Sequence, residues 1–231
     1  MKAATSLALL LAACFIATTA SAATLDRAGT WNPGVYHPDF SPNGPRALIN
    51  DGSFELGPPP ASAWTEVANY PCEWIGDFSS AWYVSAWDGY MDFWVGGYCY
   101  DDVSGLNQPS TASVTQNLEV PTGNTLLSFY YVSFRVDPDD EPLDGDQAYV
   151  SINGTEIWAL PLTQANNTYP NWTGPILVDI SAWAGETVDL TFGGASFGTA
   201  TGNLRFDYIE FVPGPTPTEE TTWGELKHQY R

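Results

Sequence analysis

Residues 147–161 read Gln-Ala-Tyr-Val-Ser-Ile-Asn-Gly-Thr-Glu-Ile-Trp-Ala-Leu-Pro. Two runs rich in β-branched and aromatic side chains flank the dipeptide Asn153-Gly154. Asn-Gly suits the tight turn in which both central residues take positive φ, and that turn matches the twist of paired strands. This stretch therefore predicts a β-hairpin with strands over residues 147–152 and 155–161.

The chain around this hairpin has the same short-strand character. Residues 126–132 are almost continuously apolar, which is typical of a central strand covered on both faces. Further candidate strands, separated by turn residues at the spacing of a β-sandwich, are Ala81–Trp87, Ala112–Val120, Thr125–Phe134, Ile176–Ile180, Thr187–Phe192 and Leu204–Val212. Residues 179–185 predict a short helical turn, and no long helix fits. We expect an all-β protein, with a single β-sandwich domain that begins near Ala47 and ends near Val212.

Composition excludes several classes of function. The 231 residues contain 7 Lys+Arg against 27 Asp+Glu, for a formal net charge of −20. Coulomb repulsion then opposes binding to nucleic acid or to an anionic membrane surface. The 10 Trp, 12 Tyr and 11 Phe supply the apolar burial that disordered chains lack. The sequence therefore indicates an acidic folded protein that does not bind nucleic acid.

The first 22 residues have the pattern of an export signal. Met1-Lys2 is followed by a largely apolar run, and Ala20-Ser21-Ala22 offers the small side chains that signal peptidase requires. The run is too short for a stable membrane span. We expect cleavage after Ala22 and a secreted or cell-surface protein. A lipobox ending at Cys14 leaves a lipoprotein as the alternative.

Export also decides how the cysteines are interpreted. Removal of the signal leaves Cys72 and Cys99 in an oxidising compartment. A disulfide between them would close a loop of about 28 residues and contribute on the order of 3 kcal/mol. The alternative is a pair of buried free thiols.

The segments that flank the predicted domain differ from it in composition. Residues 23–45 are Pro-rich and predict an irregular lead-in, while residues 213–221 predict a Pro/Thr linker. Residues 222–231 predict an amphipathic tail with Trp223, Leu226 and Tyr230 on one face. The basic end of this tail could dock onto the acidic face of another copy, or the tail could be a frayed terminus.

Aromatic residues are densest between Trp64 and Tyr100, where aspartates are interleaved with them. Sugars stack their C–H faces on flat rings and give hydrogen bonds to carboxylates, so this stretch has the chemistry of a glycan platform. The alternative is that most of these rings form the core around the disulfide. The candidate glycan-binding residues are Trp74, Trp87, Asp88, Tyr90, Asp92 and Trp94.

Three stretches carry a resemblance to a known family. Residues 48–57 read Leu-Ile-Asn-Asp-Gly-Ser-Phe-Glu-Leu-Gly and are followed by Trp64; residues 114–121 form a Gln-bearing strand; residues 204–211 read Leu-Arg-Phe-Asp-Tyr-Ile-Glu-Phe. Together these resemble the galactose-binding-like jelly-roll domains found in many carbohydrate-binding modules, over about residues 46–212. Asp51 is an insertion relative to that pattern, and residues 64–108 have no obvious counterpart.

The resemblance also implies a structural calcium ion between the opening and closing strands. Its ligands would be the carboxylates of Glu55 and Asp207, with carbonyl oxygens near Gly52 or Ser53. Carboxylate and carbonyl oxygens are the ligands that calcium prefers. The alternative is that Glu55 is an exposed turn residue and that Asp207 pairs with an arginine.

Catalytic motifs are weak. Residues 194–198 match G-x-S-x-G, but the context is β, and both histidines, His37 and His228, lie outside the predicted domain. No pair of acidic residues is distinguished as a glycosidase pair. We therefore expect a non-catalytic carbohydrate-binding module, which the implied calcium ion would stabilise. The alternative is a structural or adhesive surface protein that self-associates through its sandwich and C-terminal tail.

Overall fold

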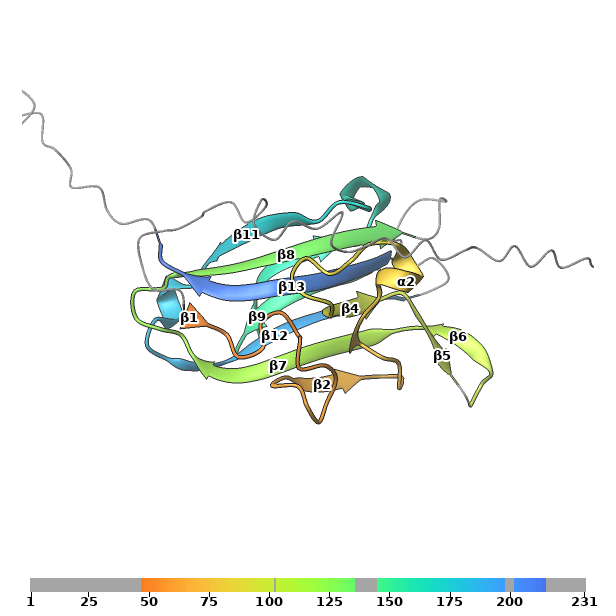
Figure 1. Cartoon of the computed structure of the whole chain (residues 1–231), viewed down its shortest axis with the longest axis horizontal. Helices are drawn as coiled ribbons and strands as arrows, with labels where there is room; N and C mark the ends of the chain where they lie inside the picture. Colours follow the sequence, from red (N-terminus) through yellow and green to blue (C-terminus); the bar gives the residue numbers. More distant parts are fainter. Residues whose placement is uncertain (1–46, 102, 136–144, 198–201, 215–231) are drawn as a thin grey trace, which may run out of the picture. The chain divides into compact units, whose positions relative to one another are not determined.

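Two antiparallel sheets face each other in the computed structural model, which describes residues 47–101, 103–135, 145–197 and 202–214 (Figure 1). The first sheet has the order β11-β8-β13-β4-β3, with β1 also paired to β13. Its strands are β1 (Ala47–Leu48), β3 (Ile75–Gly76), β4 (Asp92–Gly96), β8 (Leu126–Arg135), β11 (Thr173–Asp179) and β13 (Gly202–Val212).

The second sheet has the order β10-β9-β12-β7-β2. Its strands are β2 (Thr65–Ala68), β7 (Thr111–Glu119), β9 (Gln147–Ile152), β10 (Thr155–Pro161) and β12 (Thr187–Ala195). A separate two-stranded ribbon pairs β5 (Tyr98–Asp101) with β6 (Leu106–Pro109). The short helices are α2 (Ser79–Trp82), η1 (Gln164–Asn166) and η2 (Ser181–Trp183).

The predicted all-β sandwich is confirmed. The Asn153-Gly154 hairpin is β9–β10 with the predicted bounds, and both turn residues have positive φ. From β7 onward the chain crosses repeatedly between the two sheets, as a jelly roll does. The predicted helical turn is confirmed as η2.

Aromatic rings fill the space between the sheets. Phe192 of β12 packs edge-to-face on Phe206 of β13, with 5.1 Å between ring centroids. Phe129 of β8 contacts both rings at 5.4 and 5.8 Å. Trp158 of β10 meets Phe129 at 5.2 Å. Such pairs contribute about 0.5–1.5 kcal/mol beyond their burial, so this cluster is a main source of stability.

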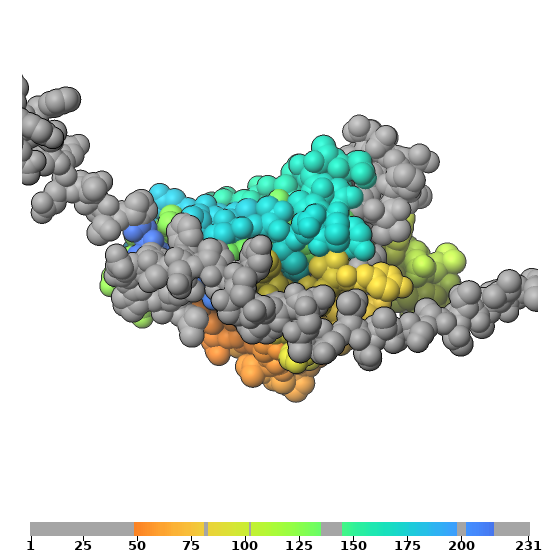
Figure 2. Space-filling view, turned by 45° about the horizontal axis from the view of Figure 1, so that its top comes forward, coloured from red at the N-terminus to blue at the C-terminus, as the bar shows by residue number. Residues whose placement is uncertain are grey.

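A third layer covers the outer face of the first sheet. Side chains alternate along a strand, so Phe206 points into the sandwich while Arg205 and Asp207 point outward, yet both are 0% exposed. The backbone after α2 covers them, because the Val84 carbonyl accepts a 2.8 Å hydrogen bond from Arg205 Nη1. In Figure 2 the yellow atoms of this segment adjoin the cyan atoms of the segment before β11.

The predicted strand Ala81–Trp87 is wrong for this reason. The segment begins as α2, and Tyr83 then takes a left-handed conformation with φ 55°. Its alternation of aromatic and small residues serves a loop that lies on a sheet rather than a strand within one. The strands from β2 to β6 around it are short and were not predicted.

The predicted disulfide is confirmed. Cys72 and Cys99 are bonded, with 5.9 Å between their Cα atoms. The bond ties the segment before β3 to the ribbon strand β5.

In the part of the chain that the structure describes, no helix is long and apolar enough to span a membrane. The predicted signal peptide, lead-in, Cys14 and residues 215–231 of the linker and tail lie outside the described residues.

Candidate functional site

Trp87, Asp88 and Tyr90 lie together in the loop that leads into β4, and we call these three residues the ledge. The indole of Trp87 stacks on the ring of Tyr130 of β8, with 4.2 Å between centroids and 14° between planes. Tyr130 is buried, and Trp87 keeps part of its surface in solvent. Tyr90 is 56% exposed. The ledge therefore presents two aromatic rings with a carboxylate between them in sequence.

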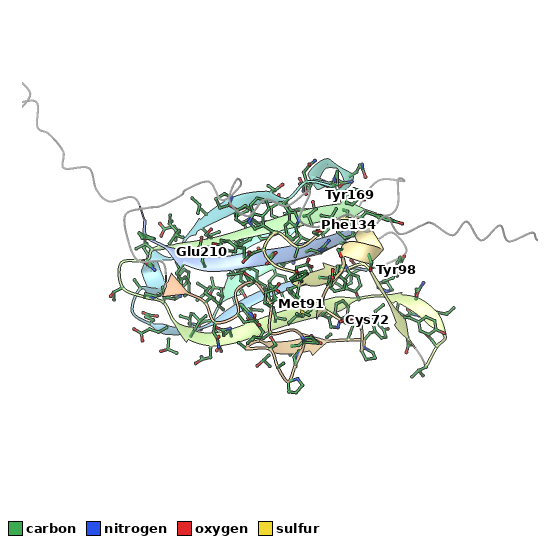
Figure 3. All side chains as sticks on the ribbon, in the orientation of Figure 1. Cys72, Met91, Tyr98, Phe134, Tyr169 and Glu210 are labelled. Atoms are coloured by element: carbon green, nitrogen blue, oxygen red, sulfur yellow. A yellow bond between two sulfur atoms is a disulfide. The ribbon has the colours of Figure 1, made fainter. Side chains whose placement is uncertain are left out.

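The backbone of the ledge is held by two carboxylates that lie far away in the sequence. The amide of Asp88 donates to Asp207 Oδ2 at 2.8 Å. The amides of Tyr90 and Met91 both donate to Glu55 Oε1, at 2.7 and 2.8 Å. Figure 3 shows Met91, the end of this anchored loop, beside the start of β4. Three backbone amides of this short loop thus have fixed acceptors, so the loop is held in one geometry.

The turn that carries Glu55 is itself docked on the closing strand. Gly52 and Ile209 of β13 are joined by a 2.9 Å bond from the Ile209 amide to the Gly52 carbonyl. A Cβ at position 52 would collide with the Ile209 carbonyl, so only glycine allows this approach. Phe54 is fully buried with φ 58°, and its anchoring leaves Glu55 facing the ledge.

Ser53 adds a side-chain link to the same place. Its hydroxyl donates to Asp88 Oδ2 at 2.9 Å. The residues that the sequence assigned to calcium and three of those assigned to glycan thus belong to one connected cluster. Nothing in the sequence indicates that the implied calcium ligands and the candidate glycan-binding residues are linked, since 35 residues separate Ser53 from Asp88.

Three candidate glycan-binding residues are buried and cannot offer a platform. Trp74 is 1% and Trp94 is 8% exposed, and they stack on each other at 4.8 Å. Asp92 is 0% exposed and forms a salt bridge with Arg205, whose Nε donates to Asp92 Oδ1 at 2.8 Å. The expectation that Trp74 and Trp94 face solvent is wrong, because β3 and β4 bring both rings beneath the covering layer.

Burial sets the protonation of the carboxyls under the ledge. Desolvation raises the pKa of Asp207 well above its usual 3.8, and the nearby Asp92 carboxylate raises it further. Desolvation also raises the pKa of Asp92 to about 6, against the opposing effect of the Arg205 guanidinium. Both groups therefore resist ionisation in the folded protein.

The implied calcium ligands do not form a calcium shell. Calcium takes roughly six to eight oxygens, yet Asp207 and Glu55 each accept backbone N–H groups and the Gly52 carbonyl accepts the Ile209 amide. Within the described residues, no three Asp, Glu, His or Cys side chains gather as they would around a metal ion. The donor set therefore does not fit the ion that the resemblance implies.

The serine of the G-x-S-x-G match has a structural environment. Ser196 is 2% exposed, its hydroxyl donates to the Gly202 carbonyl at 2.9 Å, and it accepts the Gly97 amide at 2.9 Å. It follows β12 directly, with no helix after it among the described residues. This serine therefore links the ends of strands and does not form a nucleophile elbow.

The comparisons with known proteins give fold likeness only. No model of a known protein family matches the chain, and no curated protein does. TmCBM61 in complex with β-1,4-galactotriose is 14% identical at a TM-score of 0.46, over 74% of this chain and 100% of that one. The K3 adhesin domain of Lys-gingipain from Porphyromonas gingivalis is 14% identical at 0.43, over 73% and 99%.

A third similar structure is an enzyme. The Stig cyclase Fisc from Fischerella sp. TAU is 16% identical at a TM-score of 0.42, over 74% of this chain and 98% of that one. The similar structures thus include a sugar complex, an adhesin domain and a cyclase. They do not choose between functions for this chain.

Proposed function

We propose that this protein binds carbohydrate at the ledge, without catalysis, and that it acts after export. The observation that carries the proposal is the Trp87 indole, which is held flat by Tyr130 while part of it remains in solvent. A ring fixed in this way loses little conformational freedom when a sugar stacks on it, and pre-organisation of this kind raises affinity. Tyr90 supplies a second exposed ring.

Polar recognition would come from Asp88. Its Oδ2 already accepts the Ser53 hydroxyl, so the carboxylate is oriented before any ligand arrives. Sugar hydroxyls donate well to such an oriented carboxylate, which fixes the position of a sugar stacked on the rings. Two rings and one carboxylate suit a short stretch of a neutral glycan. They offer no basic group for an acidic one.

A glycan array followed by titration with the soluble glycans that bind tests this proposal. Trp87→Ala should weaken binding at least about tenfold, the loss expected for ~1.4 kcal/mol, and Tyr90→Ala should weaken it a few-fold. Tyr100→Ala is a matched control, because Tyr100 of β5 is as exposed as Tyr90, at 56%. Its affinity should equal that of the wild type.

Two results would overturn the proposal. One is a wild-type protein that binds no glycan on the array. The other is binding that Trp87→Ala and Tyr90→Ala leave unchanged. Assays for new reducing ends on the bound glycans test the non-catalytic part, for which we expect none. Product formation that persists on repurification and disappears with a single carboxylate substitution would contradict it.

A further inference from the structure

We infer that Glu55 and Asp207 position the ledge through backbone N–H bonds and so perform in this chain the linking role that the resemblance gives to calcium. For its consequence in glycan binding, this inference rests on the proposed function. The anchoring itself is independent of any ligand. It assigns Glu55 and Asp207 as positioning residues, which act on a ligand only through the three residues of the ledge.

Glu55 and Asp207 both serve as hydrogen-bond acceptors for backbone N–H groups. Glu55 Oε1 receives two N–H groups, from Tyr90 and Met91, and Asp207 receives the amides of Asp88 and Tyr208, one on each oxygen. N–H groups carry partial positive charge, so they occupy on these carboxyl oxygens the place that a cation would take. A calcium ion on the same oxygens would be repelled by these four donors.

The loop also packs tightly against the Glu55 carboxyl group at Gly89. Gly89 has φ +70°, and a Cβ built on it would collide with the carboxyl carbon and oxygens of Glu55. The loop backbone therefore lies directly on the carboxylate. The position needs glycine twice, for its dihedral angle and for its missing side chain. An ion between Glu55 and the loop would have to displace this backbone.

A β-bulge in β13 directs Asp207 toward the loop. The pairing of β13 with β8 shifts register between Asp207 and Glu210, and Tyr208 takes φ 53°. A bulge redirects side chains where a strand meets a functional loop. Here it directs both Asp207 oxygens to backbone amides, at 2.8 Å to Asp88 and 2.6 Å to Tyr208. The closing strand thus contributes a second fixed point for the ledge.

Hydrogen exchange of the amides of residues 88, 90 and 91 measures this anchoring without any glycan. In the wild type, exchange should be equally slow in excess chelator and in millimolar calcium. Glu55→Gln keeps the Oε1 acceptor but removes the charge that calcium needs, so protection should remain. Glu55→Ala removes the acceptor, and exchange of the Tyr90 and Met91 amides should accelerate by about tenfold or more as the loop opens locally.

A further variant controls for the loss of a carboxylate that does not contact the ledge. Glu119→Ala removes an exposed carboxylate at the end of β7 and should leave all three amides unchanged. The inference fails if calcium slows exchange at the ledge, or if Glu55→Gln accelerates it as much as Glu55→Ala does. If Glu55→Ala does not fold, the calcium arm and Glu55→Gln still decide. Because no glycan is present, failure here is distinct from failure of the proposed function.

Discussion

Two stacked aromatic pairs each contain a tryptophan of the same Trp-rich segment, and the two pairs have opposite environments. Trp74 and Trp94 stack at 4.8 Å and 17°, and both are buried. Trp87 and Tyr130 stack at 4.2 Å and 14°, and Trp87 remains partly exposed. The geometry of stacking is nearly the same, so stacking does not distinguish a structural ring from a candidate binding ring.

The difference lies in what surrounds each pair. The two indole N–H groups of the buried pair donate to protein, Trp74 to the Tyr70 carbonyl at 3.2 Å and Trp94 to Asn203 Oδ1 at 2.8 Å. Phe78 of the covering layer also contacts Trp94, at 6.1 Å between centroids. Trp87 belongs to the covering layer itself, and its indole meets the sheet by stacking on Tyr130. A ring in the outermost layer is the one that keeps surface for a ligand.

Truncation of the buried pair should have the largest effect. Trp74→Ala leaves a cavity beneath the covering layer and strips Trp94 of its partner. We expect the free energy of unfolding to fall by about 3–5 kcal/mol, the usual loss for a large buried aromatic. Urea unfolding followed by circular dichroism measures it. A loss below about 1 kcal/mol would mean that this pair is not core.

Removal of the disulfide should lower the stability of the protein and leave glycan binding at the ledge unchanged. The Cys72→Ser, Cys99→Ser double variant frees the segment before Trp74 from β5. The unfolded chain gains loop entropy, so stability should fall by about 3 kcal/mol. Residues 88–91 are held by Glu55 and Asp207 instead, so glycan affinity at a temperature where the variant is folded should stay at the wild-type value. Affinity that falls with the disulfide would show that the two regions are coupled.

Asp207 should give stability a measurable dependence on pH. A carboxyl whose pKa is raised by folding binds its proton more tightly in the folded state, so its contribution is fully present below about pH 4 and is lost as pH rises through the folded pKa. Asp92, with a pKa of about 6, acts in the same direction. The slope is at most about 1.4 kcal/mol per pH unit for each group.

The variant Asp207→Asn isolates this effect from that of other carboxyls. Urea unfolding at several values between pH 4 and 8 should show a flatter profile for the variant than for the wild type. The difference in unfolding free energy between the two proteins should therefore change with pH in the variant's favour as pH rises. A difference that is constant across this range would contradict the raised pKa.

Truncation of Trp87, the partly exposed ring of the second pair, should have the smallest effect on stability. Trp87→Ala removes a half-covered ring, and the stack contributes about 0.5–1.5 kcal/mol beyond its burial. We expect a loss of about 1 kcal/mol, with glycan binding reduced far more than stability. The same urea experiment as for Trp74→Ala measures it. Equal losses for the two tryptophans would remove the distinction between the pairs.

Sequence patterns predicted the strands from β7 to β13 well, because these strands bury one face or both and their periodicity reports it. The hairpin at Asn153-Gly154 was predicted to the residue, since its turn chemistry is local. Residues 64–109 were predicted poorly. Within this stretch, the 83–91 loop is ordered by contact with the outer face of the first sheet, and the strands that it contacts, β8 and β13, come later in the chain.

The candidate site, too, could be predicted from the sequence only in part. Trp87 and Trp94 have the same side chain, and Asp88 and Asp92 the same carboxyl group, so composition could not separate them. Asp92 became a buried partner of Arg205, while Asp88 became part of the ledge. The resemblance paired Glu55 with Asp207, and in the structure both carboxyl groups accept amides of the 88–91 loop. It could not indicate that the amides of the 88–91 loop occupy their oxygens.

The sequence by itself determined the all-β class, the hairpin and the acidic, aromatic-rich character, because turn chemistry, strand alternation and residue counts are local properties. It predicted the disulfide, but only the structure excluded two free thiols. Only the tertiary structure decided which rings are core and which are exposed, and which charges are paired. Those outcomes depend on contacts between residues as far apart as Glu55 and Met91 or Asp88 and Asp207. Burial and hydrogen-bond partners exist only once such distant segments have met.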